Sequence, residues 1–356
     1  MTSKRRNKAG PRRAKFPSPG WLRIFGAVLL LTLFMPVLTT AASRTYASRT
    51  ISTANPRPMA MGGAFISVND DISALIWNPA AFTLYEREVS HRLSMHLNPV
   101  MPVLLLREDH QNVADFLAAL ASTVRAVTFS HRWAEMGLLF WEEPLYNPAA
   151  PVSGPFFDAE HILKHHVHTF GLRVRLAPTV SLGSTGNLYR IRDRRGKSVL
   201  ASGANYGVLL KPTNGLVVGL AYFDFPGALS DLRWETEGLR DESVNGGISL
   251  HPDGKTIVAM DMRDAGGEEK IGWNRFRFGF ERTFWERLAL RFGYFQTGDQ
   301  EHDVYSFGLG LFGNGWLGRG TPRYDHSSYL ANYSLLVKEG EHEQHLWHLL
   351  SVQFCI

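Results

Sequence analysis

From about residue 89 onward, apolar and polar side chains alternate along the chain. In residues 275–281, RFRFGFE, every second residue from 276 to 280 is phenylalanine. A period of two is typical of β-strands. The pattern predicts about 12–14 strands, at approximately residues 89–97, 124–131, 134–142, 164–176, 179–193, 202–212, 215–225, 243–251, 255–264, 274–283, 286–296, 303–311, 327–337 and 345–356. An apolar patch at 113–120 predicts one helix among them.

The connections between these strands have two lengths. Short turn signals occur at residues 177–179, 211–215 and 251–254. Longer polar stretches occur at residues 225–242, 264–273 and 312–327. Short turns at one end and long loops at the other are typical of a transmembrane β-barrel. The predicted fold class is therefore all-β, a transmembrane antiparallel barrel over residues 89–356.

The chemistry of the two faces favours a barrel whose apolar side chains point outward. The polar face is rich in glycine and in charged residues, which would make a poor dry core. Aromatic residues recur near the strand ends, as interfacial girdles do: Tyr222, Tyr294, Tyr305, Tyr329, Trp273, Trp285 and Trp347. A soluble β-sandwich, or a soluble barrel with an apolar interior, is the alternative that alternation alone leaves open.

The N-terminus predicts export. Residues 1–42 contain eight basic and no acidic residues, and the apolar run 24–38 precedes small residues. This is the pattern of a signal peptide, with cleavage expected after Ala41 or Ala42. An uncleaved anchor and a twin-arginine signal at Arg12-Arg13 are the alternatives. The predicted localisation is the bacterial outer membrane.

Composition narrows the class of partner. The net charge of +5 arises from this leader, because the remainder carries more acidic than basic residues. Nucleic-acid binding, which needs a clustered basic surface, therefore loses its main support. With 44% hydrophobic residues and one cysteine, Cys355, the chain is neither disordered nor a disulfide scaffold.

Residues 43–88 predict a compact segment that precedes the barrel. Gly62-Gly63 predicts a turn, and Asn69-Asp70-Asp71 predicts a turn or a helix cap. Residues 72–77 fit one or two helical turns, which Asn78-Pro79 ends. Its expected place is the lumen, as a plug.

This stretch resembles the N-terminal signature of the FadL-like superfamily of outer-membrane barrels, which includes the PorV/PorQ-type barrels. The signature is a Met-Gly-Gly-Ala run, an Asp-Asp pair and Trp-Asn-Pro-Ala. The matching residues are Met61, Gly62, Gly63, Ala64, Phe65, Asp70, Asp71, Ala74, Leu75, Trp77, Asn78, Pro79 and Ala80. The resemblance is dense in this motif and loose over the later hairpins. The chain departs from bacterial barrels at its end, Phe354-Cys355-Ile356, where an aromatic residue is usual.

The resemblance implies a 14-stranded barrel with an N-terminal plug. In the FadL branch, hydrophobic substrates bind near the plug and leave sideways through an opening in the wall. In the PorV branch, the barrel serves protein secretion or surface attachment. The first hypothesis is therefore passive uptake of small hydrophobic or amphipathic molecules, which the apolar stretch 100–106 also favours. The alternative is a non-transporting barrel in secretion or surface assembly.

Charged residues on the predicted inner face are the candidate lumen lining: Arg173, Arg175, Asp261, Arg263, Arg275, Arg277, Glu281 and Arg291. Because an isolated buried charge is costly, they are expected to pair. Two interpretations stay open at this stage. The charges form a structural ladder that holds the barrel's shape, or they line a pore that favours anionic ligands such as carboxylates.

No residue pattern predicts an enzyme, a cofactor or a metal. The Asp70–Asp71 pair fits the structural turn better than an acid pair. The histidines near His161 and His166 lack a carboxylate or cysteine at ligand spacing, and those at His342 and His345 fit a solvated loop. The expected partners are outer-membrane lipid, the barrel-assembly machinery and a hydrophobic small molecule.

Overall fold

The computed structural model describes residues 56–69, 71–82, 91–98, 113–142, 166–192, 198–225, 241–265, 273–296, 303–313, 329–339 and 344–355. The predicted signal peptide lies outside these residues. So do Asp70, His161 and the apolar stretch 100–106.

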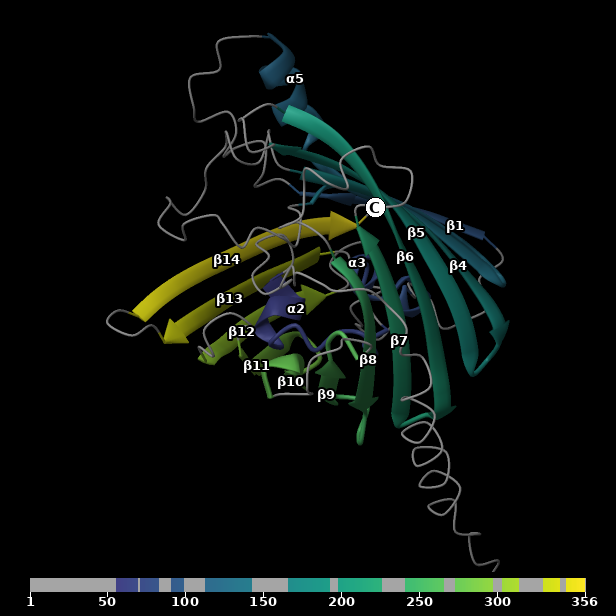
Figure 1. Ribbon diagram of the computed structural model, residues 1–356, viewed down its shortest axis with the longest axis vertical. Helices are drawn as coiled ribbons and strands as arrows, with labels where there is room; N and C mark the ends of the chain where they lie inside the picture. The colour runs from purple at the N-terminus through teal and green to yellow at the C-terminus, as the bar shows by residue number, and fades with distance from the viewer. Residues whose placement is uncertain are drawn as a thin grey trace, which may run out of the picture. The chain divides into compact units, whose positions relative to one another are not determined.

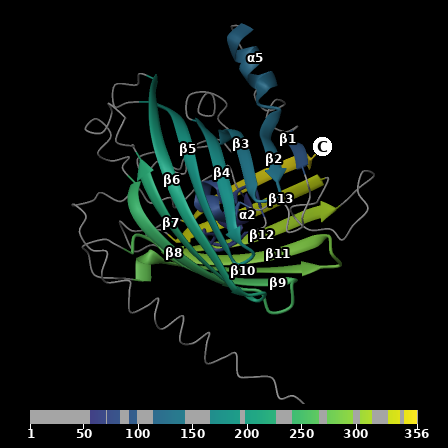
Figure 2. The ribbon, with the colours of Figure 1, turned by 90° about the vertical axis from the view of Figure 1, so that its right-hand side faces the viewer.

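Fourteen described strands form one closed antiparallel barrel, in which each strand pairs with its neighbour in sequence and β1 pairs with β14 (Figures 1 and 2). The strands are β1 His91–Leu97, β2 Val124–His131, β3 Ala134–Glu142, β4 His166–Ala177, β5 Val180–Arg192, β6 Ser198–Thr213, β7 Leu216–Phe225, β8 Asp241–Leu250, β9 Thr256–Met262, β10 Phe276–Phe284, β11 Leu288–Gln296, β12 Asp303–Gly313, β13 Tyr329–Glu339 and β14 Gln344–Cys355. The predicted all-β barrel is confirmed, with the strand number at the top of the predicted range.

The helices in the described part of the chain are short. They are α2 Pro56–Ala60, α3 Ala74–Trp77, α5 Val113–Ala121 and the 3-10 turns η2 Pro79–Ala81 and η4 Trp273–Arg275. None of them has both the length and the apolar character needed to cross a membrane. The predicted helical patch is α5, which ends just before β2 and projects past the strand ends (Figure 2). The Asn98 N–H, directly after β1, donates to the carbonyl of Thr123, directly before β2, at 2.7 Å. This hydrogen bond connects the end of β1 to the residues that follow α5.

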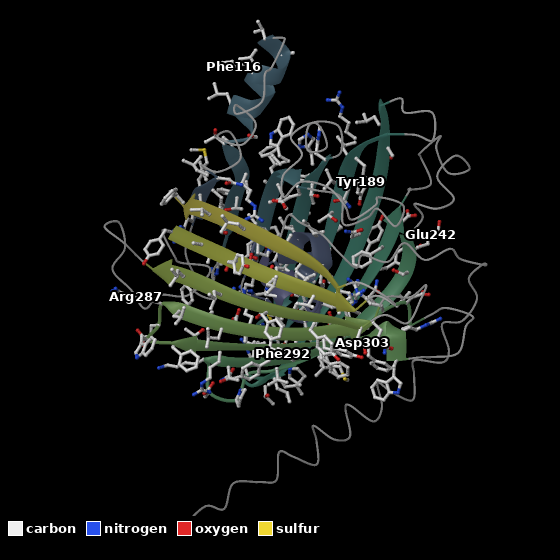
Figure 3. All side chains as sticks on the ribbon, turned by 90° about the vertical axis from the view of Figure 1, so that its left-hand side faces the viewer. Phe116, Tyr189, Glu242, Arg287, Phe292 and Asp303 are labelled. Atoms are coloured by element: carbon white, nitrogen blue, oxygen red, sulfur yellow. The ribbon has the colours of Figure 1, made fainter. Side chains whose placement is uncertain are left out.

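Alternation places apolar side chains outside the barrel and polar side chains inside it. Along β12, the outward side chains of Phe307 and Leu309 are 46% and 47% exposed, whereas the inward side chain of Ser306 is fully buried. On the outer face of β11, Phe292 (labelled in Figure 3) packs edge-on against Phe307 of β12, with ring centroids 5.3 Å apart. The outward orientation that sequence chemistry favoured is confirmed. It is the arrangement of outer-membrane barrels, in which lipid covers the apolar face.

Most short turns lie at one end of the barrel, which we call the short-turn end. Residues 132–133, 178–179, 214–215, 251–255 and 285–287 connect strands there, and β1 begins and β14 ends there. β12 ends and β13 begins at this end too, because successive strands reverse direction. The prediction that grouped 312–327 with the long loops of the opposite, long-connection end is therefore wrong.

The joint that closes the barrel is short. β1 and β14 share two described residue pairs, His96 with Cys355 and Leu97 with Phe354. By contrast, β13 and β14 share eleven. Because each ladder pair adds hydrogen bonds and side-chain contacts, the β1–β14 joint holds the first strand less firmly than β2 does.

The outward face predicts a depth-dependent cost of charge. Leu309→Arg, near the middle of β12, is expected to destabilise the barrel by about 2–4 kcal/mol in lipid vesicles, whereas Leu176→Arg, one residue before the end of β4, is expected to cost about 0–1 kcal/mol. Both side chains are exposed outward, at 47% and 62%. Denaturant unfolding in vesicles measures the difference. Equal effects of the two substitutions would contradict a lipid-facing band.

Candidate functional site in the barrel interior

The described part of the N-terminal stretch, residues 56–69 and 71–82, lies inside the barrel, and we call it the inner segment. Nearly all of its side chains are buried. Inward hydroxyls of the wall bind its backbone: Ser306 donates to the Ala60 carbonyl at 3.1 Å, and Ser181 donates to the Ala80 carbonyl at 2.8 Å. Ser249 donates to the Ser67 carbonyl at 3.2 Å. The segment is therefore attached to strands on several sides of the lumen.

A double-glycine turn follows α2 in the inner segment. Gly62 and Gly63 have φ values of +63° and +72°, in the left-handed region that favours glycine. The Gly63 N–H donates to the Pro58 carbonyl at 2.9 Å and closes the turn after α2. Met61 and Ala64 flank the turn and are fully buried.

Asn78 and Pro79 lie at the junction between α3 and the 3-10 turn η2. Pro79 begins η2, and the Asn78 side chain accepts a hydrogen bond from the Ala80 N–H at 3.0 Å. The same side chain donates to the Ile66 carbonyl at 2.8 Å. Asn78 therefore connects the part of the inner segment that contains Ile66 to the part that follows α3. Trp77 also connects these parts, because its ring packs edge-on against that of Phe65.

Asp71 is a structural carboxylate in this arrangement. Its Oδ1 accepts from the Ser73 N–H at 2.8 Å, and Arg57 Nη1 donates to Oδ2 at 3.3 Å. Burial acts to raise the pKa of Asp71, but Arg57 and the Ser73 N–H outweigh it and lower the pKa below its usual range. Asp71 therefore stays ionised at neutral pH and stabilises the folded chain until the pH falls through its depressed pKa.

A buried ion-pair network joins the inner segment to the wall. Arg57 donates through Nε and Nη2 to the two oxygens of Glu281, each at 2.8 Å. Arg291 Nε donates to the same carboxylate at 2.6 Å, and Arg291 Nη1 donates to Asn332 Oδ1 at 3.0 Å. Bidentate pairing and extra hydrogen bonds are what a buried charge pair needs to be tolerated.

A second wall carboxylate binds backbone. Asp261 Oδ2 accepts from the Phe65 N–H at 2.6 Å and from the Ile66 N–H at 2.8 Å. Two neighbouring N–H groups that converge on one carboxylate oxygen fix the chain locally. Asp261 therefore holds the segment on the β9 side of the lumen.

Arginines of the wall also pack on aromatic rings. The Arg263 guanidinium lies 4.8 Å from the Trp77 ring centroid, and that of Arg277 lies 4.7 Å from the Phe295 ring centroid. Arg277 Nη1 donates to the Gly62 carbonyl at 3.4 Å. Cation–π contact is stronger where water is excluded, so these arginines contribute to holding the segment.

The remaining lumen candidates bind groups outside the inner segment. Arg275 Nη1 donates to the Asp264 carbonyl at 2.6 Å. Arg173 pairs with Glu135 of β3, and Arg175 lies 3.9 Å from the same carboxylate. The structure thus places Asp261, Arg263, Arg277, Glu281 and Arg291 around the segment. It places Arg173 and Arg175 around Glu135, toward the short-turn end.

Inward-facing glycines form a belt around the inner segment. Nine of the described glycines belong to it: Gly137, Gly171, Gly183, Gly207, Gly219, Gly247, Gly279, Gly293 and Gly308. A Cβ atom at any of them would come within 3.0 Å of an inner-segment atom. The belt therefore lets backbone of the segment lie against backbone of the wall, and it explains why the inner face is so rich in glycine.

Sequence reasoning missed an apolar ring of inward side chains. Its members are Leu139, Phe223, Phe295, Val304, Leu336 and Leu349, at most 4% exposed. They lie on β3, β7 and β11–β14, in the half of each strand nearer the long-connection end. They share one buried cluster with Phe65 and Trp77 of the inner segment. The only sequence feature that could have revealed these side chains was their position on the inward face of each strand.

The role of Arg57 was also missed, because its partner Glu281 is 224 residues away in the sequence.

In the described residues, no group of three or more His, Cys, Asp or Glu side chains is placed to hold a metal ion. The His166 and His168 rings lie 4.7 Å apart, and Trp141 packs against both.

Loss of Arg57 is expected to destabilise the barrel by about 3–5 kcal/mol, because Arg57→Met leaves a buried carboxylate with fewer partners. Arg282→Met is the matched control, since Arg282 pairs with Asp253 at the surface, where an ion pair contributes little. Denaturant unfolding in vesicles compares the two. Similar effects of both variants would contradict a stabilising role for the network.

A Cβ in the glycine belt is expected to displace the inner segment. In Gly219→Ala the new atom would overlap the Ile66 carbonyl, at an expected cost of about 1–3 kcal/mol. Gly186→Ala on β5 is the control, because nothing lies within 4 Å of its Cβ position. Unfolding midpoints measure the cost. A neutral Gly219→Ala would mean that the segment does not lie tightly against β7.

Comparison with known proteins gave matches among solved structures. No protein-family model and no curated protein matches the chain. The CymD monoaromatic hydrocarbon channel is 12% identical, with 85% of this chain and 97% of that chain covered and a TM-score of 0.47. The Ralstonia pickettii toluene transporter TbuX is 12% identical over the same shares, with a TM-score of 0.45. At this level the likeness identifies neither a family nor a substrate, and the FadL-like resemblance stays a prediction from residues 58–82.

Proposed function

We propose that this chain is an outer-membrane barrel for passive uptake of small hydrophobic or amphipathic molecules. The observation that carries the proposal is the apolar ring. A water-filled porin has a polar interior, whereas six inward side chains here are apolar and buried next to the inner segment. An apolar lining of this kind favours an apolar ligand.

The inner segment supports a hydrophobic substrate over a hydrophilic one. It is held by the Arg57–Glu281 pair on one side and by Asp261 on another, and glycines bring the wall against it. Such a lumen suits a narrow, plugged barrel better than a wide aqueous pore. In this proposal the wall charges serve the segment, so the ladder interpretation is favoured over an anion-selective lining.

A β-bulge in the wall supports a sideways exit. The β3–β4 ladder passes from Leu139 to Glu142, and Phe140 and Trp141 have no partner in it. Trp141 has a φ of +58°, a costly conformation for a bulky residue. This bulge lies beside the apolar ring, of which Leu139 is a member. We propose that substrate passes from the ring into the bilayer here.

We propose that the protein resides in the outer membrane, because of its predicted signal peptide and the apolar outer face of its barrel. Residues 1–42 serve as a signal peptide, residues 43–88 as the plug-like region, and outer-membrane lipid covers the barrel after insertion by the barrel-assembly machinery. The proposal includes no catalytic residue, no cofactor and no nucleic-acid partner.

Uptake by reconstituted barrel tests the function. Liposomes with the full chain are expected to take up toluene or a fatty acid faster than empty liposomes, and to exclude arabinose. Leu336→Asn in the apolar ring is expected to slow hydrophobic uptake several-fold, because ligand would contact a polar group. Ser334→Asn, also inward on β13, is the matched control and is expected to have little effect.

Uptake equal to that of empty liposomes would contradict transport. The alternative, a non-transporting barrel in secretion or surface assembly, has one observation in its favour. Val113, Phe116, Leu117 and Leu120 form an exposed apolar face on α5 (Figure 3 labels Phe116). Absence of uptake, together with a protein partner whose capture is lost in Phe116→Ser, would support that alternative.

A further inference from the structure

A histidine pair lies on the outward face of the barrel at its short-turn end. His91 begins β1 and His131 ends β2, and they face each other in the β1–β2 ladder. Their Nδ1 atoms are 3.0 Å apart, and their rings are stacked with centroids 4.6 Å apart. His91 follows the outward parity of Leu93, and His131 follows that of Phe129. Both imidazoles are thus reachable from outside the lumen.

We propose that His91 and His131 bind a divalent transition-metal ion, with Cu²⁺ and Ni²⁺ preferred. Imidazole nitrogen binds such ions at about 2.0–2.1 Å. Two such bonds at about 90°, as in tetragonal Cu²⁺ or Ni²⁺ sites, place the nitrogens about 2.8–3.0 Å apart, whereas a tetrahedral Zn²⁺ site needs about 3.4 Å. The spacing of 3.0 Å matches the tetragonal case.

The chemistry of binding needs no other reactant. In the neutral pair, one ring carries its hydrogen on Nδ1 toward the other Nδ1. That ring changes to the Nε2–H tautomer, so both Nδ1 lone pairs become available and no proton is released. The remaining coordination positions are filled by water, because His91 is exposed. Cu²⁺ is expected to bind more tightly than Ni²⁺ or Zn²⁺, following the usual affinity order of these ions.

The location gives the ion a structural consequence. β1 is held on its other side by two described residue pairs with β14. An ion that joins the first residue of β1 to the last residue of β2 cross-links the weakly held strand to a firmly held one. Bound metal is therefore expected to raise the unfolding temperature of the barrel, because it binds the folded pair only.

A built-in reporter allows a direct test. The centroids of the Trp133 and His131 rings lie 5.9 Å apart, so Cu²⁺ bound by the histidine pair is expected to quench the fluorescence of Trp133. The refolded full chain in detergent is titrated with CuCl₂ and NiCl₂, with calorimetry in parallel. Trp133→Phe is expected to remove most of the quenching while calorimetric binding persists.

The variants decide the proposal. His91→Gln and His131→Gln are each expected to weaken Cu²⁺ binding at least about tenfold, since loss of a supporting group alone costs about that much. His251→Gln, a single histidine at the same end, is the matched control and should leave affinity unchanged. Boiling-dependent gel mobility verifies that each variant is folded. Unchanged affinity in both folded variants, or no saturable binding in the wild type, would overturn the proposal.

Discussion

The interior of this barrel depends on the pairing of Arg57 with Glu281. Glu281 projects from β10 into a space that water does not reach, and a lone carboxylate there would be costly. Arg57 supplies two N–H donors and Arg291 supplies a third. Arg57 also pairs with Asp71 within the inner segment, and Glu281 with Arg291 within the wall, so the Arg57–Glu281 pair joins these two ion pairs into one network. The segment is therefore an integral part of the folded barrel and not an appendage to it.

The interior also depends on close approach between the backbone of the inner segment and the backbone of the wall. Asp261 reaches the N–H groups of Phe65 and Ile66 only because the neighbouring wall position is Gly247, where a Cβ would overlap the Asp261 carboxylate. At Gly293 a Cβ would overlap the Gly62 backbone. Glycine and charge on the inner face thus cooperate: glycine brings the segment within hydrogen-bonding distance, and charge fixes it there.

The barrel was predictable from sequence because lipid outside and polar groups inside impose a strict period of two. That period predicted 12–14 strands, of which fourteen form. The outward face did not follow from the period and was predicted from the glycine, charged and aromatic residues on the two faces. The pairings of the inner charges did not follow, because Arg57 and Glu281 are 224 residues apart. The ring that includes Phe295 and Leu336 was missed because inward positions were read as polar throughout. The end at which β12 stops and β13 starts was available from counting strands, and the length of the connection alone gave the wrong answer.

The interior is uneven along the barrel axis, and this bears on the proposed uptake. Apolar side chains such as Phe223 and Leu336 line the half near the long-connection end, whereas the Glu135–Arg173 pair lies toward the short-turn end. In the proposed uptake, a hydrophobic solute gains from contact with the apolar ring, whereas displacing the buried Glu135–Arg173 pair is costly. Straight passage down the axis is thus disfavoured for such a solute. The bulge at Trp141 adjoins the apolar ring, so we propose that the solute leaves sideways into the bilayer there, where burial of apolar surface is favourable.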